Sequence, residues 1–482
     1  MAKLTFIVQS TAAFVNELWG YGAPREGVQR MAELAHRYGL PVSWITNGRG
    51  AAEMRDLFDA YHKEHGDTIT LWTKPAEMAP GGTREELPKD DYGIPLTQHR
   101  QLIQYGRVEE ISRLLAQERA RVEMALPWAA PVRTAATLHK SNQLIASLEN
   151  LGFHALWGYC WEQEDVDGAT DCGVPFNAFY ASCDSFRCPA QYPGKIVGVH
   201  WLSVDLTNAY HSRATSAFST DPNDIQRANI FHGRDIDYWK HFFLAYRENA
   251  RWNDFLYLMF HQEAHEMEHS EVCRSYTPDQ IQDTWEMMDA FFEWVCGQEE
   301  VEFLTMPEAV QRYRRAAGEW TAPTYFVSDQ IPVERIDYYY YEYFRKPEPP
   351  ADARWPRTFF YYDRDCQLVF VHNQLDPISI RDYRAQYPVD GNQAYPEEPR
   401  PASRVLRRLH RDGKEEIIFE IVTRACKSVP SGLAIWGDFS DYELVEGGLP
   451  GSRVLGEKLV FVKTVPGTGE GTTVVRLKRK RQ

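Results

Sequence analysis

The feature that most limits the fold of this sequence is a regular alternation of short apolar runs with amphipathic helical patterns over its first three hundred residues. Strands separated by helices at this spacing form parallel sheets with right-handed crossover connections. We therefore predict an α/β fold here, with a sheet that could close into a barrel or stay open. The predicted strands are residues 4–9, 41–46, 68–73, 131–137, 153–159, 195–205 and 255–261.

Helix start and stop signals support this alternation. Gly39 and Gly66 follow two of the helical patterns directly, where a residue with positive φ ends a helix. Ser141 precedes a third pattern and is suited to cap its first turn. The predicted helices cover residues 26–38, 51–64, 142–152 and 278–296, and a capping box of Thr305 and Glu308 opens a further short helix.

The chain shows two departures from this pattern. Residues 75–130 begin with a Pro/Gly-rich loop and continue as a helix-rich insertion. Near residue 320 the composition changes to β-prone runs separated by Gly, Pro and Asp turns, which is typical of a β-sandwich. We therefore predict two domains, an α/β domain over residues 1–320 and a β-sandwich-like domain over residues 321–482.

Charge and composition exclude several classes of partner. The net charge is −15, and basic residues cluster only at 476–481, whereas nucleic-acid binding needs a basic surface. The N-terminal apolar run is too short for a signal peptide, and no run approaches the ~18 residues of a membrane span. The eight cysteines have no compact zinc-binding spacing and fit free thiols. We expect a soluble, cytoplasmic protein without nucleic-acid or membrane partners, whose insertion or β-region could form homo-oligomer contacts.

Residues 265–269 read His-Glu-Met-Glu-His, the H-E-x-x-H pattern of zinc proteases. That pattern binds zinc only on a helix, where two His residues four apart face the same way. Here a predicted strand precedes the motif, and no third ligand follows at the required spacing. We therefore expect His261 and Glu263 to end the seventh strand, and His265 to lie in the loop beyond it.

Four stretches resemble segments of the polysaccharide deacetylase-like superfamily: LTFIVQS (4–10), GLPVSWITNG (39–48), EHGDTITLW (64–72) and residues 283–314. This superfamily contains polysaccharide deacetylases and barrel glycoside hydrolases of families 57 and 38. The resemblance covers about residues 1–316 and implies a seven-stranded (β/α) barrel. The stretch GYCWEQ (158–163) also resembles bacterial families that join such a barrel to a C-terminal β-domain.

The sequence departs from the metal-binding pattern of the deacetylases it resembles. Those enzymes bind a metal through an Asp after the first strand and an H-x-x-x-H pair after the third. This chain has Gln9 and Ser10 at the first position and Leu71 and Trp72 at the second. Without those ligands the usual metal-bound hydroxide cannot form, which argues against deacetylation by the usual machinery.

Candidate site residues follow the predicted strands, because the site of a parallel barrel lies at the carboxyl ends of its strands. Indole faces stack on sugar rings, while amides and imidazoles bind hydroxyl groups. The predicted substrate-binding residues are Asn47, Trp72, His139, Trp161, Trp201, His261 and His265. The candidate catalytic carboxylates are Glu162, Asp205 and Glu263, of which Asp205 and Glu263 are the favoured pair. Asp205 could instead cap a helix, and Glu162 could be one solvated charge among several.

Three functions remain open. The leading hypothesis is a carbohydrate-active hydrolase, specifically a glycosidase that uses two carboxylates on an oligosaccharide or glycoside. The second is a metal-dependent carbohydrate deacetylase or amidohydrolase, with zinc or manganese held by His261, Glu263, His265 and Asp205. The third is a catalytically inactive barrel that binds sugar. No cofactor beyond this candidate metal is indicated.

Overall fold

A computed structural model of the full chain provides the fold. It describes residues 3–13, 25–76, 98–159, 177–181, 183, 186, 195–201, 203, 220–222, 236–251, 255–264 and 278–317, and in the C-terminal part 360–363, 368–372, 403–411, 416–423, 432–436, 441–446, 453–455, 459–463 and 471–480. No helix among these residues is long and apolar enough to cross a membrane.

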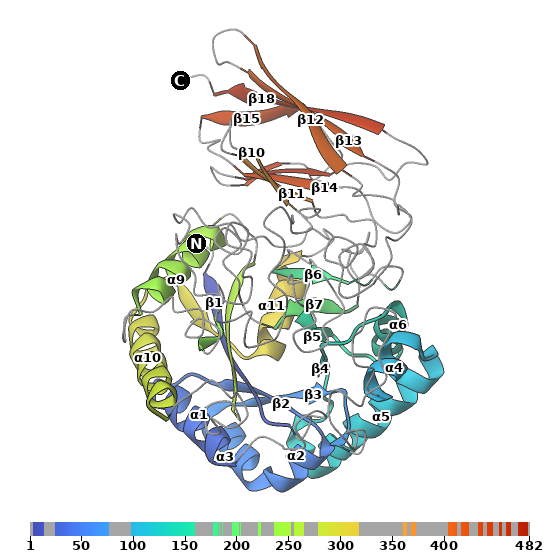
Figure 1. The fold of residues 1–482 in the computed structure, drawn as a ribbon, viewed down its shortest axis with the longest axis vertical. Coiled ribbons are helices and arrows are strands. Elements are labelled where there is room, and N and C mark those ends of the chain that lie inside the picture. The colour runs from blue at the N-terminus through green and yellow to red at the C-terminus, as the bar shows by residue number, and fades with distance from the viewer. Residues whose placement is uncertain are drawn as a thin grey trace, which may run out of the picture.

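One curled mixed sheet organises the N-terminal part, with the strand order β6-β7-β5-β4-β3-β2-β1-β8 (Figure 1). All neighbours are parallel except the edge pair β6 and β7, and β9 adds to the start of β1. The strands are β1 Leu4–Thr11, β2 Val42–Thr46, β3 Thr68–Trp72, β4 Thr134–Ala136, β5 Ala155–Tyr159, β6 Ala178–Tyr180, β7 Val197–His200, β8 Tyr257–Glu263 and β9 Val301–Phe303. All seven predicted strands are present, although β4 and β7 are shorter than predicted and β6 was not predicted.

The side of the sheet between β8 and β6 is spanned by side chains rather than by a strand ladder in the described residues. The Asn177 amide donates to the Tyr257 carbonyl (2.9 Å) and accepts from the Tyr257 N–H (3.0 Å). The Tyr257 hydroxyl in turn accepts from the His200 N–H (2.9 Å), and Ser203 Oγ accepts from the Met259 N–H (2.8 Å). On the side of β8 away from β1, backbone groups at the start of the strand are therefore satisfied without a second neighbouring strand.

Helices cover the outer face of the sheet (Figure 1). They are α1 Arg25–Arg37, α2 Gly48–Glu53, α3 Arg55–His65, α4 Gln98–Tyr105, α5 Val108–Ala125, the short 3₁₀ helix η3 Pro127–Ala129, α6 Asn142–Asn150, α9 Asp237–Ala250 and α10 Pro278–Cys296. The prediction of a single helix over residues 51–64 is wrong, because the structure has two helices in this region, α2 and α3. Asn47 starts a helix earlier by accepting from the Gly50 N–H, and the buried Met54 breaks it with a non-helical backbone.

Two apolar clusters lie on opposite faces of the sheet. The outer cluster joins Phe6, Trp44 and Phe260 to the covering helices. The inner cluster joins Ile7 and Trp157 to α11 Met306–Ala317, whose Met306 and Tyr313 pack inside the curl. Because α11 contacts residues that precede β5 and β7, it fills the side where the strands begin. The predicted capping box holds α11, since Glu308 accepts from the Thr305 N–H at 2.9 Å.

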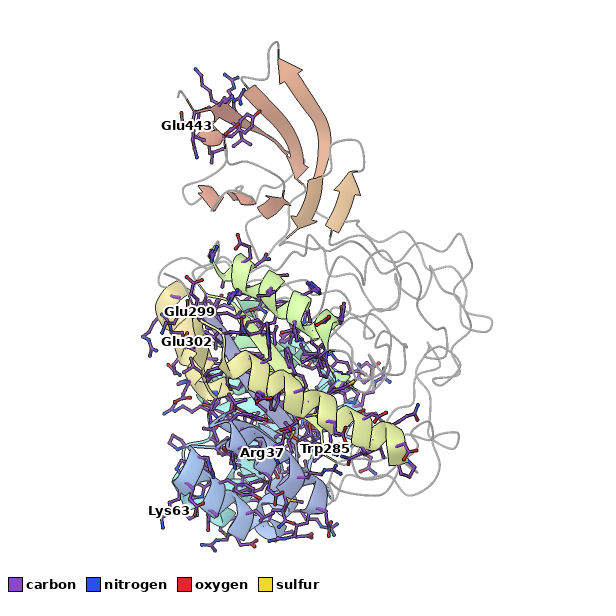
Figure 2. All side chains as sticks on the ribbon, turned by 90° about the vertical axis from the view of Figure 1, so that its left-hand side faces the viewer. Arg37, Lys63, Trp285, Glu299, Glu302 and Glu443 are labelled. Carbon is purple, nitrogen blue, oxygen red and sulfur yellow. The ribbon has the colours of Figure 1, made fainter. Side chains whose placement is uncertain are left out.

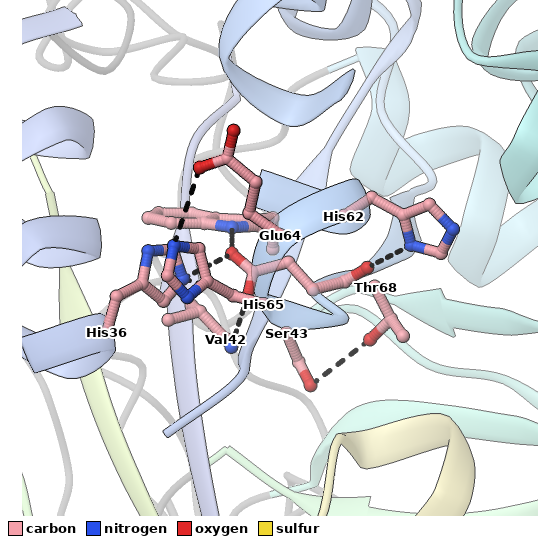
Figure 3. Close-up of polar contacts among 9 residues, drawn as sticks. His36, Val42, Ser43, His62, Glu64, His65 and Thr68 are labelled. Carbon is pink, nitrogen blue, oxygen red and sulfur yellow. Dashed lines mark hydrogen bonds and ion pairs between the residues drawn. The ribbon is translucent and has the colours of Figure 1, made fainter. Parts of the chain in front are cut away.

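A buried carboxylate links several elements at the amino ends of the strands, whereas the predicted site lies at their carboxyl ends (Figure 3). Asp67 precedes β3 and is 1% exposed. It accepts from the Val42 N–H (2.9 Å) and from the Trp44 indole N–H (2.6 Å), and it pairs with His36 of α1 (2.9 Å). His65 stacks on the His36 ring, with 3.7 Å between centroids. Asp67 thus links β2, β3 and α1 at the amino ends of the strands.

The helices α1 and α10 pack side by side through polar and aromatic contacts, and Figure 2 shows Arg37 and Trp285 in this region. The Arg30 guanidinium lies over the Trp285 ring at 4.6 Å. Asp289 of α10 accepts from Arg37 (2.7 Å) and from the Tyr38 hydroxyl (2.9 Å). The last long helix of this part is therefore fixed against the first.

The C-terminal strands form two antiparallel sheets. One has the order β10-β11-β14-β17-β16 and the other the order β12-β13-β18-β15. Their bounds are β10 Phe360–Asp363, β11 Leu368–His372, β12 Ser403–Arg411, β13 Glu416–Thr423, β14 Gly432–Trp436, β15 Tyr442–Glu446, β16 Arg453–Leu455, β17 Leu459–Lys463 and β18 Gly471–Arg479. The described C-terminal residues lie mainly in strands, in agreement with the predicted β-rich character, and the face-to-face packing of a sandwich stays a prediction.

Candidate functional site

Side-chain alternation places the last residues of β8 and β1 on the inner face of the sheet. In β8, Met259 belongs to the inner cluster and Phe260 to the outer one, so His261 and Glu263 continue the inner row. The parallel register sets Gln9 of β1 beside His261 and Thr11 beside Glu263. A carboxylate, an imidazole, an amide and a hydroxyl therefore share the inner face at the carboxyl ends of two adjacent strands.

Two tryptophans line the same inner face. Trp72 ends β3 and Trp157 lies in β5, with 6.3 Å between their ring centroids. The Trp157 ring lies 5.0 Å from the His261 ring, and its indole N–H donates to the Trp201 carbonyl at 3.2 Å. Side chains from β3, β5 and β8 thus meet inside the curl.

A bulge at Gly158 turns Tyr159 away from the inner face. In a regular strand Trp157 and Tyr159 would face the same side, but the register with β7 shifts between them. Gly158 has φ of 106°, a backbone conformation that L side chains rarely adopt. Ala155 and Trp157 face the inner cluster by regular alternation, whereas the shift turns Tyr159 toward the outer one.

Several polar atoms on the inner face have no hydrogen-bond partner in the described part of the chain. They are Gln9 Oε1, Thr11 Oγ1 and the Trp72 indole N–H. Buried polar groups are normally hydrogen-bonded, and leaving one unpaired costs roughly 1–3 kcal/mol. The Gln9 amide oxygen, the Thr11 hydroxyl and the Trp72 indole N–H are therefore available to the hydroxyl groups of a ligand.

The exposure of these residues changes along the strands. The first six residues of β8 are buried and Glu263 is the first that is partly exposed. Trp72 is likewise partly exposed, after a fully buried Leu71. The site therefore opens at the carboxyl ends of the strands, and α11 fills the other side.

The structure brings together only some of the predicted site residues. Trp72, His261 and Glu263 lie on the inner face, and Trp201 packs against it; their roles in a site stay a prediction. Asn47 has a different position, because its amide caps α2 and donates to the Lys74 carbonyl at 3.1 Å. Four predicted residues lie outside the described residues: Trp161, Glu162, Asp205 and His265. The sequence reasoning missed Trp157 and Thr11, although alternation within the strands could have indicated both.

His139 belongs to a second polar cluster, on the outer side of β3 and β4. Its ring lies 5.8 Å from that of His99, and the His99 Nε2 atom lies 3.1 Å from the Thr73 hydroxyl. Burial, followed by the charge of Lys74, lowers the pKa of His99 to about 3. Burial also lowers the pKa of His139, with further contributions from His99 and from the charges of Arg100, Lys74 and Lys140. Both imidazoles are therefore neutral near pH 7.

At the positions where the sequence resemblance would place the metal ligands of the deacetylases, this chain has other residues. The Gln9 amide on β1 donates to the Met306 sulfur at 3.2 Å, and the last residue of β3 is Trp72. Among the described residues no three His, Cys, Asp or Glu side chains are grouped to hold a metal. The set suggested by the sequence includes Asp205 and His265, which lie outside these residues and leave that prediction open.

Comparisons with known proteins find only structures of low similarity to this chain. No protein-family model matches the sequence, and no curated protein matches it. A structure described as a polysaccharide deacetylase from Mycobacterium smegmatis has 12% identity and a TM-score of 0.38, covering 69% of this chain and 96% of that one. The PuuE allantoinase has 10% identity and a TM-score of 0.37, covering 65% and 91%. The 4-α-glucanotransferase from Thermococcus litoralis has 9% identity and a TM-score of 0.38 over both whole chains.

Proposed function

We propose that this protein is a carbohydrate-active hydrolase, and more specifically a glycosidase, whose site lies inside the curled sheet. The observation that supports this most directly is the inner row of Glu263, His261 and Trp157 beside the polar atoms of Gln9 and Thr11 that lack described partners. An aromatic wall suits the C–H faces of a sugar, and unpaired acceptors suit its hydroxyl groups. Glu263 is the one carboxylate placed at the opening among the described residues of this row.

Glycoside hydrolysis needs a second carboxylate. We assign that role to Asp205, because Ser203, two residues before it in the chain after β7, accepts a hydrogen bond from the Met259 N–H of β8. One carboxyl group protonates the leaving oxygen, and the other acts as a nucleophile or activates water. His261 lies beside Glu263 on the strand, two residues away, and would bind a substrate hydroxyl. At the scale of the whole chain, this proposal takes the sheet as a (β/α) barrel followed by a β-sandwich-like domain.

The test compares Glu263→Gln and Asp205→Asn with the wild type on a panel of nitrophenyl glycosides and neutral oligosaccharides. Loss of a catalytic carboxylate should reduce kcat by at least about 10³-fold while binding is kept, because the amide retains the shape but not the proton transfer. Glu299→Gln, an acidic residue after α10, is the matched control and should keep full activity. Hydrolysis that survives both substitutions would refute the assignment.

Metal analysis of the purified protein separates this proposal from a metal-dependent deacetylase. A glycosidase of this kind should keep its activity after treatment with a chelator. Release of acetate from an acetylated oligosaccharide, abolished by the chelator and restored by zinc or manganese, would favour the deacetylase instead. Saccharide binding without turnover, unchanged by both substitutions, would indicate an inactive sugar-binding barrel.

A further inference from the structure

The second polar cluster concentrates basic and imidazole groups at one place on the rim of the sheet. Lys74 follows β3, Lys140 follows β4, and Arg100 lies in the first turn of α4. Arg100 and Lys140 are only 1% and 2% exposed. Long basic side chains are seldom buried this completely, and their burial requires neighbouring groups that satisfy their charge and hydrogen bonds.

Backbone contacts hold the parts of this cluster in place. The Lys140 ammonium donates to the Gly158 carbonyl (2.5 Å) and the Leu138 carbonyl (3.3 Å), and it lies 5.0 Å from the centroid of the Tyr159 ring. The Arg100 Nε–H donates to Gln104 at 3.0 Å, one turn further along α4. The Ser141 hydroxyl donates to the Ile103 carbonyl, which fixes α4 against the chain that follows β4.

Two imidazole nitrogens in this cluster have no partner among the described residues. They are Nδ1 of His99 and Nδ1 of His139, and His99 is 1% exposed. When the Thr73 hydroxyl donates to Nε2 of His99, Nδ1 carries the ring proton and can donate it.

We propose that the carboxyl ends of β3 and β4, together with the first turn of α4, form a binding site for an oxyanion. The anion would accept from the imidazole Nδ1–H groups of His99 and His139 and lie beside Lys74, Arg100 and Lys140. The shared chemistry is that of phosphate and carboxylate oxygens, which accept charge-assisted hydrogen bonds from such donors. The proposed oxyanion site lies on the outer side of the sheet. It does not depend on the hydrolysis proposed for the inner side.

Calorimetric titration of the full chain tests the proposal, in a buffer without other oxyanions and at constant ionic strength. The two probes are inorganic phosphate, which represents a free ion, and glucuronate, which represents the acidic group of a saccharide. We expect one molecule of at least one probe to bind. His139→Gln should weaken that binding at least tenfold, and Arg100→Gln should weaken it further. Arg37→Gln, which removes an exposed arginine of α1, should leave it unchanged.

The two probes distinguish the kind of anion that binds, and the variants test whether it binds at the proposed site. Binding of phosphate alone supports a site for the free ion, and binding of glucuronate supports a site for an acidic sugar. Arg100 is buried, so the fold of Arg100→Gln is checked by circular dichroism; the partly exposed His139 carries the test if that variant does not fold. Absence of binding at millimolar concentrations of both probes would overturn the proposal, as would binding that His139→Gln leaves intact. Neutral glycoside hydrolysis would be unaffected by either result.

Discussion

Single residues show how far sequence reasoning reaches in this protein. His261 and Glu263 could be placed on the inner face because a strand has a side-chain period of two, and an apolar run fixes which side is buried. Asp67 could not be identified in the same way. Its donors, Val42 and Trp44, belong to another strand, and only the folded sheet brings them within 3 Å.

Asp67 provides a residue-scale prediction about stability. Asp67→Ala leaves the Trp44 indole N–H and the Val42 N–H buried without an acceptor, and it removes the partner of His36. We expect the free energy of unfolding to fall by about 3 kcal/mol. Urea denaturation followed by circular dichroism measures this loss.

Asp289→Ala is the control for that measurement. Asp289 also accepts hydrogen bonds from two side chains, but it is 39% exposed, so water can replace it. Exposed ion pairs contribute about 0–1 kcal/mol, and the control should lose no more than that. Equal losses in the two variants would contradict the role given to Asp67.

Secondary-structure elements were largely predictable, and the exceptions have physical causes. The helix ends at Gly66 and the caps at Ser141 and Thr305 were predicted because they depend on residues close in sequence. The short β6 and the break at Met54 depend on packing against distant parts of the chain. The bulge in β5 was also not predictable, because a single glycine, Gly158, is a weak signal for a bulge in a sequence.

Gly158 provides the prediction for this element. A Cβ at this position would lie 2.3 Å from the Thr137 carbonyl oxygen, and φ is 106°. We expect Gly158→Ala to lower the free energy of unfolding by about 3 kcal/mol, because backbone strain and a steric clash add. The displaced strand should also move Trp157, which a change in tryptophan fluorescence would report.

Gly66→Ala separates strain from clash. Gly66 also has positive φ, at 80°, but a Cβ there would meet nothing within 4 Å. Its substitution should cost about 1 kcal/mol and leave the tryptophan fluorescence unchanged. If both variants lost the same stability, the close approach of Thr137 to Gly158 would have no energetic importance.

At the scale of the whole molecule, the sheet separates two polar regions that meet at its rim. Trp72 faces the inner cluster, and the next residue, Thr73, contacts His99 on the outer side. The sequence indicated a site at the carboxyl ends of the strands. It did not indicate that the polar residues there form one group on the inner side of the sheet and another on the outer side. His99 comes from the helical insertion, whose position over β3 and β4 no local pattern specifies.

Neutral buried imidazoles make the stability of the whole molecule depend on pH. In the unfolded chain His99 and His139 take up protons as the pH falls below about 6.5, whereas burial lowers both pKa values in the folded protein, that of His99 to about 3. The unfolded state then binds more protons, so the free energy of unfolding should fall with decreasing pH. His99 alone gives a loss of about 2 kcal/mol between pH 7 and pH 5, and His139 adds to this loss. Urea denaturation across this range should show a shallower pH dependence for the double variant His99→Gln/His139→Gln than for the wild type. His241→Gln, at an exposed position of α9, is the control for the removal of an imidazole. An unchanged slope in the double variant would mean that these two imidazoles take up protons equally in both states.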